Sequence, residues 1–260
     1  MHQGWPKFAE SLWMASAQGG LAAIAYAPCQ LRTRIAGVPI AVEEQTGYPF
    51  DGRIRLIIQP ARPLHFPLSL RIPGWAHAAT VRLNGKTVES AGACEYAFLS
   101  REWKVGDEVE LVLPMKPAIR RWYGNSVVVE RGPILFSLPI ETEWQKLRTC
   151  GMTADWEARP RSAWNYGLPN QGDVQLSETK HSADRGRSIF SLEGTPVKIE
   201  VQGRKIPQWR AENGVAGELP SGPVMSGQPA EKLVLVPYGA AKLRITVFPM
   251  VQAVTSVAGS

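Results

Sequence analysis

The sequence feature that most constrains the fold is a set of strand-like segments around residue 80. Residues 68–72 alternate apolar and polar side chains until a Pro-Gly pair stops them, and residues 79–88 contain two further short runs. Asn84-Gly85 joins these two runs, and Asn-Gly favours a tight type I′ turn because both central positions need positive φ. The middle of the chain is therefore predicted to be antiparallel β-structure, with Leu68, Leu70 and Ile72 facing a core.

Other segments show the same period of two. Residues 53–59 place Ile54, Leu56 and Ile58 on one face, and residues 108–113 do so with Val109, Leu111 and Leu113. Further strands are predicted over residues 21–27, 30–35, 38–44, 96–100, 126–130, 133–138, 188–192, 197–201, 232–236 and 242–248. The pattern weakens over residues 141–187, which are predicted to form long ordered loops. Many short strands at this spacing are typical of antiparallel sandwiches or barrels and not of a βαβ fold.

One segment has a helical period instead. Residues 6–17 place Phe8, Leu12 and Trp13 on one stripe, and the glycines after residue 18 end the pattern. Pro114–Pro117 separates two β-rich halves. The sequence thus predicts a mainly-β fold: two antiparallel β-sandwich, jelly-roll-like domains, residues 19–116 and 117–250, with one helix in residues 1–18 and a frayed tail, residues 251–260.

Composition argues against several classes of protein. The net charge is +6 over 260 residues, but the basic residues are scattered, so no nucleic-acid surface is predicted. The sequence contains no run of 18 apolar residues, so no membrane-spanning helix is predicted. The four histidines and three cysteines are isolated, and no glycine-rich phosphate loop opens a helix, so no metal site or cofactor is predicted. Residues 1–7 lack the features of a signal peptide, which favours the cytoplasm if Met1 is the natural start.

Aromatic residues supply the candidate binding residues. The chain has nine tryptophans, whose flat faces can stack on the C–H surface of a sugar, although most tryptophans are buried for packing. Two adjacent groups, in residues 122–123 and 164–166, are the candidates for carbohydrate contact, through Trp122, Tyr123, Trp164 and Tyr166.

Carboxylates are the candidate catalytic groups, because glycoside hydrolysis usually needs two carboxylates that face each other. Glu130, Asp155 and Glu157 are the candidates, but each has arginines nearby in sequence, and a salt bridge is the simpler interpretation. No spacing rule selects a pair, so no catalytic residue is assigned in this chain.

An ordered series of motifs resembles glycoside hydrolase family 127, the β-L-arabinofuranosidase-like proteins. The first half contributes Gly47-Tyr48-Pro49-Phe50, Leu70–Trp75, Val81–Gly85, Arg101–Asp107 and Leu113-Pro114-Met115. The second half contributes Val129–Pro133, Trp164–Leu168, Val236–Gly239 and Leu243–Pro249. These segments resemble the family's middle and C-terminal β-sandwich domains and cover nearly the whole chain.

The resemblance implies that the chemistry lies outside this sequence. Family members carry an acid/base Glu, a nucleophilic Cys and a Cys-rich zinc site on an upstream (α/α)6 barrel. Residues 1–18 resemble the last helix of that barrel, and no Cys pair precedes them. Cys29 does not match the nucleophile. The resemblance thus implies a truncated protein whose partner is the missing N-terminal barrel.

Two hypotheses follow. The first is that the chain is the non-catalytic β-sandwich portion of a family 127-like hydrolase, whose parent is a retaining β-L-arabinofuranosidase acting on plant-type arabinosides. The chain would support the barrel, could shape substrate access, and would be inactive alone. The alternative is a stand-alone carbohydrate-binding module that uses exposed tryptophans.

Overall fold

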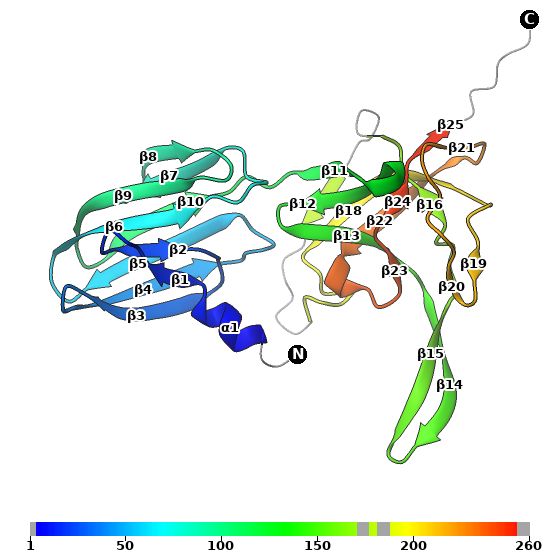
Figure 1. The fold of residues 1–260 in the computed structure, drawn as a ribbon, viewed down its shortest axis with the longest axis horizontal. Coiled ribbons are helices and arrows are strands. Elements are labelled where there is room, and N and C mark those ends of the chain that lie inside the picture. The colour runs from blue at the N-terminus through cyan, green and yellow to red at the C-terminus, as the bar shows by residue number, and fades with distance from the viewer. Residues whose placement is uncertain (1–3, 171–176, 181–187, 254–260) are drawn as a thin grey trace, which may run out of the picture. The chain divides into compact units, whose positions relative to one another are not determined.

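The computed structural model describes residues 4–170, 177–180 and 188–253 (Figure 1). The chain forms two compact units, residues 1–116 and 117–260. Strands dominate both units, and α1 (Gly4–Glu10) is the one α-helix of the described residues. The predicted mainly-β fold with a single helix is confirmed.

Unit 1 is a sandwich of two sheets. The first sheet has the order β1-β2-β6-β9, formed by β1 (Trp13–Ala15), β2 (Leu21–Ala23), β6 (Leu64–Arg71) and β9 (Tyr96–Trp103). The second has the order β3-β4-β5-β10-β7-β8, formed by β3 (Cys29–Ile35), β4 (Val38–Thr46), β5 (Arg53–Pro60), β10 (Asp107–Val112), β7 (Ala79–Leu83) and β8 (Lys86–Ala91). Residues of both sheets bury their side chains in one core.

The alternation in the sequence correctly identifies the inward face. Leu68 and Leu70 of β6 are fully buried, and Ile72, just after the strand, is 1% exposed. They meet the inward residues of the opposite sheet, including Leu56 of β5 and Leu111 of β10. Burying such side chains contributes about 1.5–3 kcal/mol each.

The Asn84-Gly85 turn is confirmed as the link between β7 and β8. Both residues have positive φ, 49° for Asn84 and 80° for Gly85. The Asn84 side chain also ties the hairpin to β10, because its amide donates to Asp107 at 2.9 Å and its oxygen accepts from the Glu108 N–H at 2.8 Å.

Unit 2 is built around a branched nine-stranded sheet. Its main path is β11 (Pro117–Trp122), β12 (Ser126–Arg131), β13 (Ile134–Pro139), β22 (Ala230–Pro237), β18 (Val197–Lys205) and β16 (Tyr166–Gly167). Three short strands pair outside this path: β17 (Ser177–Lys180), β23 (Arg244–Ile245) and β24 (Phe248–Pro249). Consecutive residues Val127, Val128 and Val129 are all buried, so β12 is covered on both faces.

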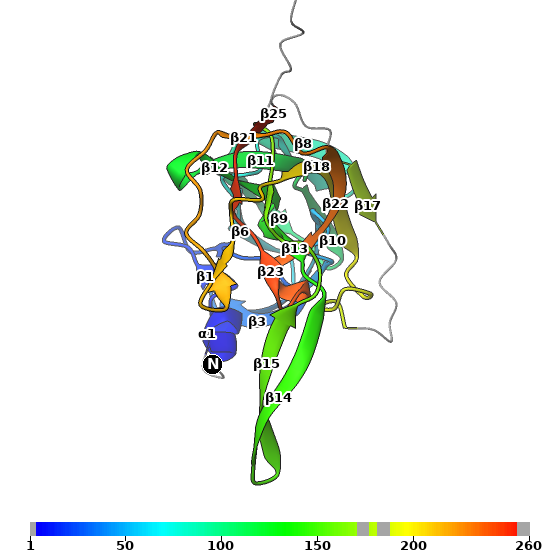
Figure 2. The same ribbon diagram turned by 90° about the vertical axis from the view of Figure 1, so that its right-hand side faces the viewer.

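Smaller elements complete unit 2. The 3₁₀ turns η1 (Tyr123–Asn125) and η2 (Tyr238–Ala240) follow β11 and β22. Three two-stranded sheets join β14 (Thr142–Cys150) with β15 (Thr153–Pro160), β19 (Ala211–Glu212) with β20 (Val215–Ala216), and β21 (Val224–Ser226) with β25 (Val251–Ala253). The β14–β15 ribbon, which we call the arm, extends away from the rest of unit 2 (Figures 1 and 2).

The helix predicted over residues 6–17 is wrong in its second half. The helix ends at Glu10, and Trp13–Ala15 pairs antiparallel with β2. Leu12 and Trp13 are buried in the unit 1 core, whereas no residue of α1 is buried. Backbone pairing with β2 and burial of two adjacent side chains therefore outweigh the helical spacing of the sequence.

Other departures concern the second half and the edges. Residues 188–192 form turns instead of a strand, residues 142–160 form the arm instead of loops, and residues 251–253 are a strand instead of tail. The part of the predicted tail after residue 253 lies outside the described residues. The sheets are also not wholly antiparallel, because β2 pairs parallel with β6 and β21 with β25.

Candidate functional site

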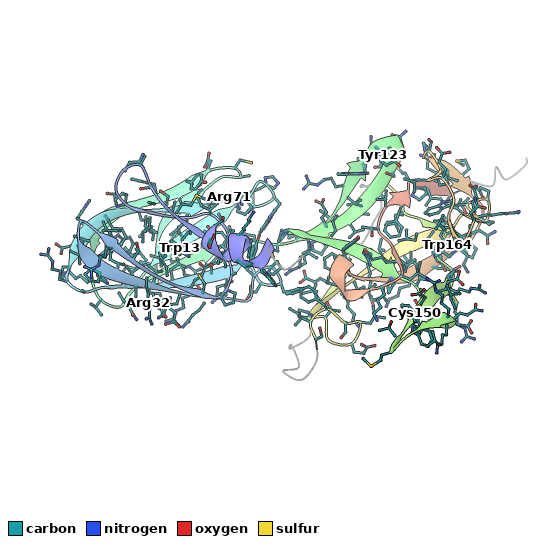
Figure 3. The ribbon with its side chains drawn as sticks, turned by 60° about the horizontal axis from the view of Figure 1, so that its bottom comes forward. Trp13, Arg32, Arg71, Tyr123, Cys150 and Trp164 are labelled. Atoms are coloured by element: carbon teal, nitrogen blue, oxygen red, sulfur yellow. The ribbon has the colours of Figure 1, made fainter. Side chains whose placement is uncertain are left out.

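Two of the four aromatic residues singled out in the sequence are open to solvent. Trp122, at the end of β11, is 55% exposed, and Tyr123, in η1, is 71% exposed. They adjoin in sequence, but Figure 3 shows Tyr123 and Trp164 on separate parts of unit 2. The four residues therefore do not form one surface.

Trp164 and Tyr166 serve packing. Trp164 is half-buried and meets Trp209 edge-to-face, with 5.0 Å between ring centroids. Tyr166 is 6% exposed and donates its hydroxyl to Glu231 at 2.8 Å, while the Lys205 ammonium lies 5.6 Å from its ring centroid. Burial leaves the Tyr166 ring too little exposed surface for stacking on a sugar.

The three candidate carboxylates are engaged in ion pairs. Glu130 pairs with Arg120 at 2.7 Å, Asp155 with Arg148 at 2.5 Å, and Glu157 with Arg159 at 2.8 Å. Arginine neighbours hold each of them, as the salt-bridge interpretation predicted.

A cleft of about 410 Å³ lies in unit 2, at the base of the arm. It is formed by the end of β13, the start of β14, the turn after Ser188, and the segment that follows β22. The lining residues are Pro139, Ile140, Glu141, Thr142, Trp144, Phe190, Ser191, Leu192, Glu193, Gly239, Ala240, Ala241, Lys242 and Leu243.

Local contacts hold the walls of the cleft. The Ile140 N–H donates to the Leu243 carbonyl at 2.9 Å. The Arg244 guanidinium donates to the Ala241 and Lys242 carbonyls and lies 3.7 Å from the centroid of the Tyr238 ring. These bonds fix the segment after β22 across the end of β13.

Gly239 gives one wall its shape. A side-chain carbon at this position would stand 3.1 Å from Cδ1 of Phe190, closer than an ordinary contact. The absent side chain thus lets the Phe190 ring lie on the η2 backbone. Phe190 itself remains 62% exposed.

The polar groups of the cleft have mixed charge. Glu141 and Glu193 contribute carboxylates, and the Lys242 ammonium lies 5.3 Å from the Trp144 ring centroid. Within the described ranges neither carboxylate forms an ion pair. An apolar lining that also carries carboxylate acceptors and an ammonium donor suits a small ligand that combines C–H surface with hydroxyl groups.

The arm places two tryptophans on one face. Opposite residues in an antiparallel pair share a face, and Trp144 pairs with Ala158 while Lys146 pairs with Trp156. Trp144 is 48% exposed and Trp156 is 54% exposed. This face is not predicted from the sequence, because residues 142–160 show no apolar alternation and are expected to form loops.

Unit 1 contains the most strongly perturbed carboxyl group. Glu44 is 2% exposed and accepts hydrogen bonds from Trp13 Nε1 at 3.0 Å, the Ala27 N–H at 3.0 Å and Cys29 Sγ at 3.5 Å. Burial raises the pKa of Glu44 to about 7, although the three hydrogen bonds by themselves would lower it. Burial, followed by the nearby Glu44 charge, also raises the pKa of Cys29 to about 11. The group is enclosed, so we interpret it as a structural tether for β1.

The sequence resemblance implies a Cys-rich zinc site upstream of this chain, and the described cysteines do not gather into such a site themselves. Cys29, Cys94 and Cys150 are free thiols in separate elements. No group of three or more His, Cys, Asp or Glu side chains in the described ranges could hold a metal ion. No helix among the described residues is both long and apolar enough to span a membrane.

Comparison with known proteins relates unit 1 to one family. Residues 20–115 match the family model of the β-L-arabinofuranosidase GH127 middle domain. These residues are therefore similar to a GH127 middle domain, and the match does not extend to unit 2. A comparison with curated proteins found no match.

Solved structures extend the likeness of fold beyond the GH127 middle domain. A GH127 β-L-arabinofuranosidase from Geobacillus stearothermophilus T6 superposes with a TM-score of 0.64 at 24% identity, over 95% of this chain and 35% of that one. A glycoside hydrolase gives 0.61 at 25% identity, over 91% and 37%. A GH127 β-arabinofuranosidase gives 0.61 at 21% identity, over 90% and 35%. The chain thus spans little more than a third of the solved proteins it matches.

One of the motifs that resemble GH127, Arg101–Asp107, has a structural role in unit 1. Trp103 is fully buried against Phe66 and donates its indole N–H to the Phe66 carbonyl at 2.9 Å. Asp107 accepts from the Lys104 N–H at 2.8 Å and lies 3.7 Å from Arg101. Residues 101–107 therefore close the end of the sandwich and join β9 to β10.

Proposed function

We propose that this chain is the non-catalytic β-sandwich part of a GH127-like glycoside hydrolase. In this proposal it supports an α-helical barrel that carries the acid/base, the nucleophile and the zinc site, and it needs no cofactor itself. The match of residues 20–115 to the GH127 middle domain is the observation that carries the proposal. The fold likeness over 95% of the chain, against 35% of the solved enzyme, supports it.

The surface of α1 is consistent with a helical partner. All residues of α1 are exposed, and Trp5 and Phe8 are 75% and 40% exposed. Their rings lie together, with 5.7 Å between centroids. Exposed aromatic pairs of this kind are typical of interaction surfaces, so we propose that this face of α1 packs on the barrel.

The first test is hydrolysis. The purified 260-residue chain is expected to release no aryl group from an aryl β-L-arabinofuranoside above the buffer rate, because a supporting domain lacks the reacting groups. Initial rates at several protein concentrations measure this. Turnover that co-purifies with the chain and scales with its concentration would contradict the proposal. A known GH127 β-L-arabinofuranosidase provides the positive control for the assay.

A further inference from the structure

We propose that the cleft of unit 2 and the tryptophan face of the arm form one binding site for a neutral oligosaccharide of the arabinoside class. Trp144 belongs to both surfaces, because it lines the cleft and shares a face of the arm with Trp156. The site is distinct from the Trp122-Tyr123 pair that the sequence singled out.

The two faces of the arm differ in chemistry. One face carries Trp144, Trp156 and Ala158, with Lys146 directly opposite Trp156, and the register keeps these residues on the same side. The opposite face carries the ion pairs Arg148–Asp155 and Arg159–Glu157. A two-stranded ribbon in water is only marginally stable by itself, so a ligand that covers one face would stabilise it. The ion pairs of the opposite face do not account for tryptophans on this one. The aromatic face is thus the side that a ligand would cover.

The arm is held at its base and open beyond it. The Glu141 N–H donates to Ser162 Oγ at 3.0 Å, and the Arg161 N–H donates to the Glu141 carbonyl at 2.8 Å. All residues of β14 after Thr142 are exposed. The base bonds fix Trp144 relative to the cleft, so the arm forms an extension of its wall.

The chemistry of the cleft favours a polyol over a charged or purely apolar ligand. Phe190 and Leu192 supply exposed apolar surface, at 62% and 39%. Glu141 and Glu193 can accept hydrogen bonds from hydroxyl groups, and Lys242 can donate to a ring or hydroxyl oxygen. The opposed charges disfavour a strongly anionic or cationic ligand, and the cleft volume of about 410 Å³ is that of a small-ligand site.

The spacing of the tryptophans favours an extended ligand. Trp144 and Trp156 are diagonal neighbours across the ribbon, and such pairs lie about 7–8 Å apart, a distance that a short oligosaccharide spans. A sugar ring in the cleft would contact Trp144, and a following ring would reach Trp156. The printed descriptions of the similar solved enzymes supply the arabinoside class as the first probe.

Titration calorimetry of the full 260-residue chain with arabinan oligosaccharides of three to five units tests the site. We expect weak binding in the millimolar range. Trp144→Ala should weaken binding about tenfold or more, and Trp156→Ala less, because stacking on one ring is worth roughly one decade. Trp144→Phe keeps a ring and should restore part of the affinity. Trp122→Ala is the matched control, since Trp122 is 55% exposed outside the site, and it should change affinity less than twofold.

Several outcomes would overturn the site. Flat heats with every arabinan oligosaccharide would do so, as would an equal loss of affinity in Trp122→Ala. Sedimentation that reveals dimers abolished by Trp144→Ala would make this face an interface between copies of the chain. Circular dichroism and thermal melting must match wild type before any variant is compared. The supporting role proposed above does not depend on this site, and it is tested by hydrolysis.

Discussion

Trp103→Ala is expected to lower the free energy of unfolding of unit 1 by about 3–5 kcal/mol. Trp103 is fully buried, so its removal leaves a large cavity between the sheets and breaks the indole hydrogen bond to the Phe66 carbonyl. Differential scanning calorimetry should show the transition of unit 1 shifting down by roughly 12–20 °C.

Trp5→Ala is the matched control for this experiment. Trp5 is 75% exposed, so its replacement should change stability by less than about 0.5 kcal/mol. Equal shifts in the two variants, or a shift below about 1 kcal/mol in Trp103→Ala, would mean that the Arg101–Asp107 segment does not close the sandwich as described.

The stability of unit 1 is expected to fall as the pH rises from about 4.5 to about 7, through ionisation of Glu44. Its pKa is raised by burial from 4.5 to about 7, so the folded state binds this proton more tightly than the unfolded state. The contribution is fully present below pH 4.5 and lost as pH rises through 7, and its size is about 3 kcal/mol. Chemical denaturation between pH 4.5 and 8.5 measures it.

Glu44→Gln should flatten this part of the pH profile. The amide cannot ionise, although it also accepts fewer of the hydrogen bonds from Trp13 and Ala27. Glu102→Gln, at an exposed position, should keep the wild-type slope. An unchanged slope in Glu44→Gln would show that another group titrates in this window. The hydrogen bond from Arg55 lowers the pKa of Glu108 and that from Tyr166 lowers the pKa of Glu231, so these groups act only at more acid pH.

The sequence predicts the sandwich of unit 1 well because its long strands, such as β4, β5 and β6, bury one face and leave the other nearer to solvent. Ile54 and Leu56 face the core, and the exposed side chains between such positions keep the period of two visible. The Asn84-Gly85 turn is predicted equally well, because positive φ favours Asn and Gly. Leu12 and Trp13 led to a wrong helix prediction because their spacing fits a helix. Their burial instead depends on the β1-β2-β6-β9 sheet, whose last two strands lie far along the sequence.

The candidate site is harder to predict from the sequence. The arm buries neither face, so its strands lack the apolar alternation that marks a half-buried strand. The cleft joins Trp144, Phe190 and Lys242, which lie far apart in sequence. The pairing of β13 with β23 brings the Lys242 segment next to the start of the arm. The aromatic residues of the sequence predicted a surface for carbohydrate contact, but one of those chosen, Tyr166, is buried in the interior.

The pairing of β1 has a consequence for where the first domain begins. The family match starts at residue 20, yet β1 lies before it, covers the edge of β2 and supplies Trp13 to the Glu44 carboxylate. A protein cut at the family boundary would expose the backbone donors and acceptors of Leu21–Ala23, and uncapped strand edges are templates for aggregation. It would also leave Glu44 with one donor fewer. The folded domain therefore begins before the family match, and the additional strand β1 protects the edge of β2.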